Sequence, residues 1–407
     1  MNILYVEHYA GSPDMGMEFR PYYLSREWVK NGNKVRIVAA SFSHLRKVNP
    51  VVKKDFSLQL IDNIEYQWIK TSKYSGNGIK RVASIYQFVS KVKRNAKRIA
   101  KDFMPDIVIC SSTYPFDIYA GRKIANLSKA KLIYEGHDLW PLTLIEIGGM
   151  SKNNLFIRKM ARAEHCAYEK SDIVVSLLPF AYEYMLENGL QSKNKFHHIP
   201  NGIVKEDWQN PMELPQAHKL LLESLKQERF VVMYAGGHAL SNKLDTLLDC
   251  AAITKDDSSI AYVLVGSGVE KKRLESRKEK EILQNVFFLE GVNKLAIPNL
   301  LSYADALYIG GEAPLYRYGI SMNKVYDYMM AGKPIVYGVK AKNNDVKEAK
   351  AGIEFDFDDV NSLSEAIYSL KKMTIEERRK MGENGKKWVL DNCDYKKLAS
   401  SFLELMK

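Results

Sequence analysis

A polar helix face within residues 313–338 is the part of the sequence best suited to bind a charged ligand. Ser321 can cap a helix that contains Asn323, Lys324 and Asp327. Asn323 and Asp327 are four residues apart and therefore share one helical face. A lysine in the first turn of a helix suits a diphosphate, and a carboxylate one turn later can accept hydrogen bonds from ribose hydroxyls. Packing alone does not explain so polar a face, so we predict a nucleotide-binding role for it.

Glycine-bearing turns after predicted strands are further candidates for phosphate contact. Gly236 and Gly237 end a predicted strand in a turn that could cradle a phosphate, with Lys243 as a nearby cation. Gly16 lies in the loop after the first strand, near a helix start where an anion could approach backbone N–H groups. The turn LVGSGVEKKRLE is interpreted as structural, because Lys271 replaces the third glycine of a dinucleotide fingerprint. The loop after the first strand also lacks the GxGxxG fingerprint, because only Gly11 and Gly16 are available there, so a nicotinamide cofactor is not expected.

His137 is the candidate catalytic side chain in the first half of the chain. It directly follows a predicted strand, and the residues alone leave a structural and a catalytic role equally open. Asp356 and Asp358 form a DxD pair, but their place before a predicted helix favours N-capping over Mn²⁺ or Mg²⁺ binding. Zinc-protease, serine-hydrolase and Walker motifs are absent from the sequence. No metal site is predicted.

The order of predicted strands and helices indicates how these candidates are held. Apolar strands are predicted at residues 2–6, 34–40, 106–112, 131–137 and 172–178, then at 229–237, 261–268, 286–291, 306–311 and 334–338. Strands that alternate with helices indicate parallel α/β sheets, which bind ligands beyond the carboxyl ends of their strands. We predict two Rossmann-like domains, at residues 1–202 and 203–389. A final helix at about residues 390–407 is expected to pack back on the first domain.

Length and composition fit two such domains in a reducing compartment. The 407 residues are 46% apolar and 27% charged, which supplies two full cores and argues against disorder. The four cysteines lie far apart and form no CxxC pair, so neither disulfides nor a zinc site is expected. The amino terminus has the pattern of a buried strand, and no apolar run is long enough to span a bilayer. We expect a cytoplasmic protein.

The formal net charge of +12 is unevenly distributed. Between Lys70 and Lys101 there are ten lysines or arginines and no acid. Residues 79–103 have a helical period, with apolar residues on one face and basic residues on the other. Such a helix can contact an anionic membrane, or it can face a core with a solvated outer side, and both interpretations stay open. A nucleic-acid partner is not expected, because no recognition module is evident.

The ordered motifs together resemble those of the family-4 retaining glycosyltransferases of GT-B fold, particularly bacterial enzymes that assemble O-antigen or capsule polysaccharides. The resemblance covers essentially the whole chain and includes the segments YEGHDLWP, IPNGI, YAGGHALSNKLDTLLDCA and YGISMNKVYDYMMAGKPIV. It implies two domains that face each other across a cleft. It also implies transfer from a nucleoside diphosphate sugar, expected to be UDP-linked, without a bound metal or other cofactor.

The resemblance assigns roles to several of the candidates. His137 matches the family's active-site histidine, which contacts the donor sugar, and Asp327 matches the second acid of its Glu-x7-Glu motif, expected on the ribose. Gly16 is implied to lie near the donor phosphates and the acceptor. Asn323 and Lys324 are implied to face the diphosphate, with Lys324 stabilising the leaving group.

This sequence departs from the family pattern at two places. Gly319 stands where many relatives carry the first glutamate of the motif. Gly237 and Asn242 stand where an arginine and a lysine often occur, so we expect other cations to meet the phosphate charge. The candidates are Lys324, Lys243 and Arg317.

The implied acceptor is a saccharide linked to polyprenyl diphosphate, used in surface polysaccharide synthesis. The protein is then expected at the inner face of the plasma membrane, in peripheral contact through basic residues 80–101. Two alternatives stay open: a nucleotide-sugar epimerase of the same architecture, and a non-catalytic protein that binds anions or membranes. Donor turnover that requires an acceptor would exclude the epimerase, and donor turnover in EDTA would exclude the non-catalytic protein.

Overall fold

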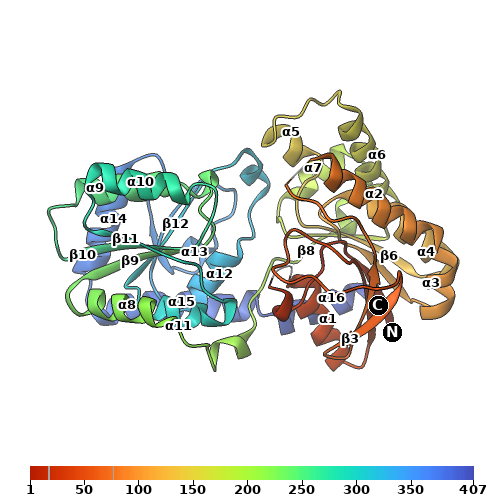
Figure 1. Ribbon diagram of the computed structural model, residues 1–407, viewed down its shortest axis with the longest axis horizontal. Helices are drawn as coiled ribbons and strands as arrows, with labels where there is room; N and C mark the ends of the chain where they lie inside the picture. The colour runs from red at the N-terminus through yellow and green to blue at the C-terminus, as the bar shows by residue number, and fades with distance from the viewer. Residues whose placement is uncertain (17–18, 77) are drawn as a thin grey trace. The chain divides into compact units, whose positions relative to one another are not determined.

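The computed structural model describes residues 1–16, 19–76 and 78–407, which form two compact units (Figure 1). The first unit comprises Met1–Asn201 together with Tyr395–Lys407, and the second comprises Gly202–Asp394. Each unit is built on a sheet of mostly or wholly parallel strands with helices packed against it. The α/β class predicted from the strand and helix pattern is therefore confirmed.

The first unit has an eight-stranded sheet in the order β3-β4-β2-β1-β5-β6-β7-β8. Its strands are β1 (Asn2–Val6), β2 (Lys34–Ala40), β3 (Ser57–Ile61), β4 (Ile64–Ile69), β5 (Ile107–Cys110), β6 (Lys131–Gly136), β7 (Ile173–Ser176) and β8 (Phe196–His198). The central strands are almost wholly buried, as their continuous apolar sequences require in a sheet covered on both faces. Because β1, β5 and β6 are neighbouring parallel strands, the loops that follow their carboxyl ends lie together on one side of the sheet.

The sequence pattern missed one part of this sheet. Strands β3 and β4 form an antiparallel hairpin at its edge. Asp62 and Asn63 make the turn, with φ of 49° and 63°. These left-handed conformations suit the tight turn of a two-residue hairpin, for which aspartate and asparagine are favoured residues.

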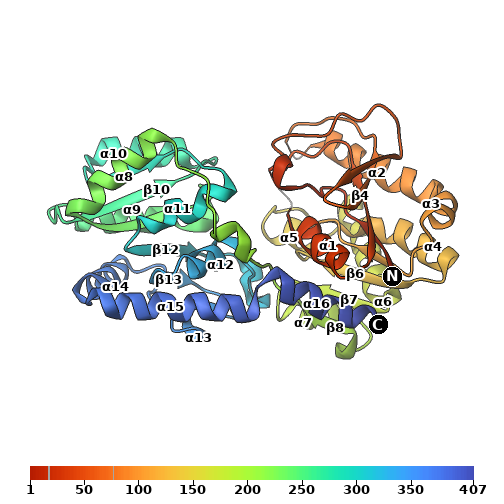
Figure 2. The ribbon, with the colours of Figure 1, turned by 90° about the horizontal axis from the view of Figure 1, so that it is seen from below.

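Eight helices accompany this sheet in the described part of the first unit. They are α1 (Arg20–Lys30), α2 (Ile79–Arg94), α3 (Ala96–Phe103), α4 (Ile118–Ser128), α5 (Leu142–Glu146), α6 (Leu155–Lys170), α7 (Ala181–Glu187) and α16 (Tyr395–Met406). The last of them packs against α1 (Figure 2). The Trp28 indole donates to the Ala399 carbonyl at 3.0 Å, and its ring lies 5.3 Å from that of Phe402. These contacts join the end of the chain to the first unit.

The basic segment is two helices rather than the single helix predicted over residues 79–103. Asn95 separates α2 from α3, and its side-chain amide donates to the Lys91 carbonyl at 2.9 Å, which satisfies the end of α2. The predicted apolar face is buried at Ile85, Val89, Val92, Ala96, Ile99 and Phe103. This face packs into the unit, so it is not available for insertion into lipid; the basic outer side remains exposed over much of its length.

The second unit has a six-stranded sheet in the order β11-β10-β9-β12-β13-β14, and all neighbouring strands in it pair in parallel. Its strands are β9 (Phe230–Ala235), β10 (Ile260–Val265), β11 (Val286–Leu289), β12 (Ala306–Gly311), β13 (Ile335–Val339) and β14 (Gly352–Glu354). Its helices are α8 (Gln216–Glu228), α9 (Leu244–Ile253), α10 (Lys271–Glu281), α11 (Ile297–Ser302), α12 (Asn323–Met330), α13 (Asp345–Glu348), α14 (Val360–Lys372) and α15 (Ile375–Asn392).

Alternate residues of the central strand β9 enter two separate cores. Val231 and Met233 pack in one core with residues of α8, α11, α12 and α15, whereas Val232 and Tyr234 pack in the other with residues of α9, α10 and α14. Figure 1 shows these helix groups on opposite sides of the sheet. The double covering leaves the ends of the strands as the open edges of the sheet, which is where ligands bind in such folds.

Among the described residues no helix is long and apolar enough to cross a bilayer.

Candidate active site

Lys324 is the central cation at the carboxyl ends of the strands in the second unit. It lies in the first turn of α12, and its half-buried ammonium donates to the Tyr234 hydroxyl at 3.1 Å and to the Asn242 side-chain oxygen. The ammonium also lies 5.0 Å from the centre of the Tyr234 ring. Burial lowers the pKa of Lys324 to about 8. Lys324 therefore joins the start of α12 to the loop that follows β9.

The loop after β9 is held against the end of β10 by close backbone contacts. A Cβ on Gly266 would stand 2.0 Å from the Gly236 carbonyl oxygen, so a glycine is required there. The N–H groups of Gly236 and His238 donate to the Val265 and Ser267 carbonyls. Of the predicted phosphate-binding pair, Gly236 therefore shapes the turn, because its N–H is already used within the protein. A Cβ on Gly237 would meet only the Ser267 carbonyl oxygen, 4.0 Å away, which leaves room for a ligand above it.

Lys243 contacts different groups from those of Lys324. Its ammonium lies 2.7 Å from Glu312 and 3.7 Å from Asp358, and the hydrogen bond to Glu312 raises its pKa. The residue has a left-handed φ of 49° at the start of α9. Because two carboxylates already neutralise it, Lys243 is a weaker candidate for phosphate binding than the sequence indicated.

The remaining predicted residues surround the start of α12. Asn323 is its first residue and is exposed, whereas Met322 and not Ser321 is the N-cap. Ser321 instead places its hydroxyl 3.4 Å from that of Tyr326. Arg317 is exposed in the preceding 3₁₀ turn, where its guanidinium donates to the Pro314 carbonyl at 2.7 Å. The prediction that Ser321 caps the helix is thus wrong by one residue.

Asp327 forms an ion pair that the sequence analysis did not predict. The Lys294 ammonium lies within hydrogen-bonding distance of both of its carboxylate oxygens, at 2.6 Å and 2.5 Å. The Asp327 side chain is 12% exposed and that of Lys294 is 37% exposed. Lys294 follows β11 in a 3₁₀ turn, so the pair lies near the carboxyl end of that strand. It neutralises the carboxylate while leaving the lysine partly open to solvent.

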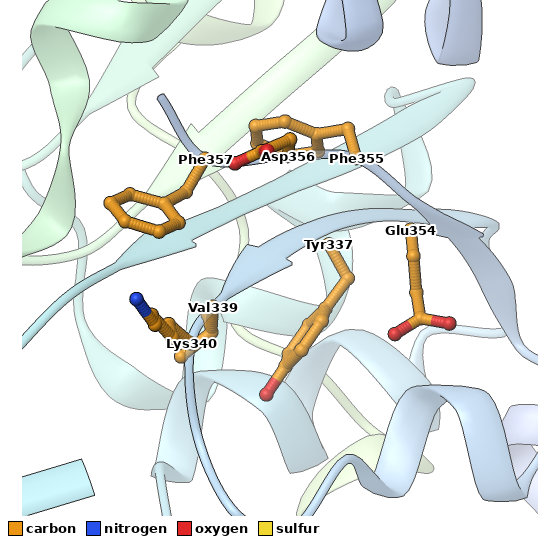
Figure 3. A pocket seen from close by; sticks show the side chains of 7 residues that line it. All are labelled: Tyr337, Val339, Lys340, Glu354, Phe355, Asp356 and Phe357. Atoms are coloured by element: carbon orange, nitrogen blue, oxygen red, sulfur yellow. The ribbon is translucent and has the colours of Figure 1, made fainter. Parts of the chain in front are cut away.

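Asp356 of the DxD pair borders a separate cavity of about 310 Å³ at the ends of β13 and β14. Figure 3 shows the side chains that line it, which include Lys340 and Asp356. The Asp356 carboxylate accepts the Asp358 N–H at 3.3 Å, and Asp359 caps α14 through the Asn361 N–H. The DxD pair therefore organises the entry into α14. Among the described residues no three histidine, cysteine or acidic side chains are grouped to hold a metal ion.

In the first unit, His137 lies beside a buried carboxylate after β6. Its Nε2 atom is 2.8 Å from the Ser111 hydroxyl and 3.4 Å from Glu135. The Ser111 hydroxyl donates to Glu135 at 2.6 Å, so its oxygen accepts a hydrogen bond from His137 Nε2–H. A neutral His137 then carries its acceptor lone pair on Nδ1. Ser111 and Glu135 thus determine which ring nitrogen of His137 can accept a hydrogen bond.

Glu135 is held by a buried arginine. The Arg20 guanidinium donates to Glu135 at 2.9 Å and 3.0 Å, and it also donates to the Ile199 and Pro200 carbonyls. The relative exposure is 4% for Arg20 and 0% for Glu135. Burial alone would raise the pKa of Glu135, but Arg20 and the hydrogen bonds from His137 and Ser111 outweigh it and hold the pKa far below its usual range.

Gly16 lies at the end of a 3₁₀ turn rather than at the start of α1. Its φ of 85° is left-handed, and its N–H donates to the Ser12 and Pro13 carbonyls at 3.1 Å. The helix itself begins four residues later, at Arg20. Met17 and Glu18, which follow Gly16, lie outside the described residues.

Family models match both halves of the chain. Residues 15–207 match the model described as Glycosyltransferase Family 4, and residues 222–388 match the model described as Glycosyl transferases group 1. The two matches do not overlap and together span most of the chain. The protein is a family-4 glycosyltransferase. No curated protein matches this glycosyltransferase.

Solved structures share the fold of this glycosyltransferase at low sequence identity. Sucrose-phosphate synthase from Thermosynechococcus elongatus is 15% identical with a TM-score of 0.74, and the match covers 100% of this chain and 98% of that one. HepE from Anabaena, in complex with UDP and glucose, is 15% identical with a TM-score of 0.67 and coverage of 100% and 99%. WaaG, a glycosyltransferase involved in lipopolysaccharide biosynthesis, is 14% identical with a TM-score of 0.67 and the same coverage. These likenesses show the GT-B fold.

Proposed function

We propose that this glycosyltransferase moves a sugar, with retention of configuration, from a nucleoside diphosphate sugar bound by the second unit. The observation that carries the proposal is Lys324, a half-buried ammonium that has no carboxylate partner among the described residues. Burying an unpaired cation is unfavourable, and a bound anion would compensate it. A diphosphate at the start of α12 supplies that anion, next to the open space above Gly237.

The same cation suits the chemistry of the leaving group. As the bond between the anomeric carbon and the diphosphate oxygen breaks, negative charge grows on that oxygen, and Lys324 stabilises it without a divalent ion. The acceptor hydroxyl forms the new bond on the same face of the sugar and gives its proton to the departing diphosphate. His137 Nδ1 offers an acceptor for a hydroxyl of the donor sugar. Asp327 is proposed to accept a hydrogen bond from the ribose, with Lys294 keeping its carboxylate in place.

UDP is the proposed nucleotide, and likeness in fold to HepE, solved in complex with UDP and glucose, supports it. The proposed acceptor is a lipid-linked saccharide of surface polysaccharide synthesis. The exposed cations of α2 and α3 support the proposal that the enzyme acts at an anionic membrane surface, the inner face of the plasma membrane.

Donor binding is tested by thermal unfolding with UDP-glucose, UDP-N-acetylglucosamine, GDP-mannose and ADP-glucose. At about 100 times its Kd, the correct donor stabilises the folded state by about 2.7 kcal/mol, which raises the unfolding midpoint by several degrees. We expect the same shift of the unfolding midpoint in the presence of EDTA. We also expect sugar transfer in EDTA when a lipid extract that contains the acceptor is added. The proposal fails if no donor shifts the midpoint, if EDTA abolishes transfer, or if the donor is epimerised without any acceptor.

Asp327→Asn is expected to raise the donor KM about tenfold, because a hydrogen bond to a charged group is lost. kcat at saturating donor should change little, since the ribose lies away from the reacting carbon. Steady-state kinetics with varied donor measures this split. Lys347→Met is the matched control, because its ammonium pairs with Glu354 at the surface, 2.9 Å away. An unchanged KM in Asp327→Asn, or an equal rise in the control, would exclude the ribose contact.

A further inference from the structure

A cavity in the first unit combines aromatic walls with a basic rim. It has a volume of about 320 Å³ and lies between α2, α4, α6 and the turn before α4. Its principal side chains are Tyr86, Phe116, Tyr119, Lys93, Lys159 and Arg162. The volume is at the lower end of the range for small-ligand pockets, enough for a phosphate and the first carbons of an attached chain.

Three aromatic residues at the cavity, Tyr86, Phe116 and the adjoining Phe156, form one connected surface. The ring centres of Tyr86 and Phe116 are 5.4 Å apart, and those of Phe116 and Phe156 are 5.8 Å apart. The Lys93 ammonium lies 5.5 Å from the centre of the Tyr119 ring. Tyr119 thus has a cation beside it at the border between the aromatic and basic parts of the cavity.

The basic residues have no counter-charge among the described residues. Lys93, Lys159 and Arg162 are exposed, and none of the described residues that border the cavity is acidic. Within the described chain, none of the three forms an ion pair with a carboxylate. Three cations around one cavity therefore leave an uncompensated positive potential that an anionic group would neutralise.

Exposed apolar residues continue the same two helix faces. Leu155 is four residues before Lys159 and seven before Arg162, so the three share one face of α6. Ile79 is seven residues before Tyr86 on α2. Ile79 is 88% exposed and Leu155 is 66% exposed, at the first position of each helix. A small soluble anion would make no contact with these exposed apolar side chains, whereas a lipid surface would bury them.

We propose that this cavity binds the phosphate headgroup of an anionic membrane phospholipid and so docks the first unit on the bilayer. Lys93, Lys159 and Arg162 contact the phosphate, and the aromatic residues contact the glycerol and upper chain. Ile79 and Leu155 enter the interface beside it. The inference deepens the proposed function by naming a lipid class and a site, and it extends the contact beyond residues 80–101 to α6.

The test is sedimentation of the full chain with vesicles of phosphatidylcholine alone, or mixed equally with phosphatidylglycerol, at low salt. We expect binding to the mixed vesicles only. Lys159→Ala/Arg162→Ala should lower it at least about tenfold, since each cation near an anionic surface contributes about 1 kcal/mol. The matched control, Lys386→Ala/Lys387→Ala, removes the same charge from exposed positions on α15 in the second unit, and its binding should fall much less. Lys159→Gln/Arg162→Gln serves if the alanine pair does not fold.

Three results would overturn the proposal: equal binding to phosphatidylcholine alone, equal losses in the two variant pairs, or displacement by inorganic phosphate beyond that caused by NaCl of the same ionic strength. The last result would indicate a site for a soluble anion. Donor stabilisation in solution should be unchanged in Lys159→Ala/Arg162→Ala. A protein that binds vesicles but no donor would contradict the proposed function alone, and one that binds donor but no vesicles would contradict this inference alone.

Discussion

Replacing Lys324 with alanine is expected to lower kcat by about 10²–10³-fold, the usual effect of removing one preorganised donor that stabilises transition-state charge. The loss should be large because the ammonium is half-buried and is already positioned by Tyr234 and Asn242. Initial rates of sugar transfer at saturating donor measure it. A kcat close to that of the unchanged protein would exclude Lys324 from the reaction.

The same lysine predicts a pH dependence. Because burial lowers its pKa to about 8, the cation is present below that pH and is lost as the pH rises through it. kcat/KM reports the free enzyme, so it should fall above about pH 8. A bound diphosphate favours the cation, so kcat should persist to higher pH. In Lys324→Arg the side chain stays charged, and the decline of kcat/KM should disappear.

Lys333 provides the control for this titration. Burial and the neighbouring Lys226 lower the pKa of Lys333 to about 8 as well. Lys333 precedes β13, however, so it lies at the amino ends of the strands and not at the carboxyl ends. Lys333→Ala should therefore retain both the activity and the decline above about pH 8. If the decline of kcat/KM were lost in Lys333→Ala but kept in Lys324→Arg, then Lys333 and not Lys324 would be the group that titrates.

The place of Lys324 in the first turn of a helix could be predicted from the sequence, because it depends on local periodicity. The carboxyl ends of parallel strands lie on the same side of a sheet. The helix that starts after β12 must therefore begin near the turn that follows the neighbouring strand β9. The sequence could not predict which side chains the lysine contacts. Asn242 replaces a cation of the family pattern, and the structure brings the Lys324 ammonium to its side chain.

The pairs that the sequence analysis missed join residues far apart in the chain. Arg20 and Glu135 are 115 residues apart, and Lys294 and Asp327 are 33 apart, so no helical or strand period relates them. One indication was present: Glu135 follows the apolar residues LIY inside the strand KLIYEG, and a charge at a buried position of a strand requires a partner. The partner itself depends on how α1 packs on the sheet, which local pattern does not determine.

Arg20→Ala is expected to destabilise the first unit by about 3–5 kcal/mol, because it leaves the buried Glu135 carboxylate without its guanidinium. The Ile199 and Pro200 carbonyls lose their donor as well. Hydrogen exchange of peptides that cover β5 and β6 measures the loss. Peptides that cover β9 in the second unit are the internal control and should exchange at unchanged rates. Equal protection of β6 in both proteins would show that the pair does not stabilise the fold.

The cause of that loss can be separated from simple cavity formation. Arg20→Ala/Glu135→Gln leaves no charge unpaired, and the glutamine oxygen can still accept from Tyr5 and Ser111, so the double variant should be more stable than Arg20→Ala alone.

The pH dependence of stability supplies a second check. The pKa of Glu135 in the folded state is below its unfolded value of about 4.3, so the stabilisation by the pair is present above that value and is lost as the pH falls. Without Arg20, burial holds the carboxyl pKa higher than it is in the unchanged protein, so the difference in stability between the two proteins should narrow on acidification. A difference that stays constant with pH would mean that lost packing, and not an unpaired carboxylate beside His137, destabilises the variant.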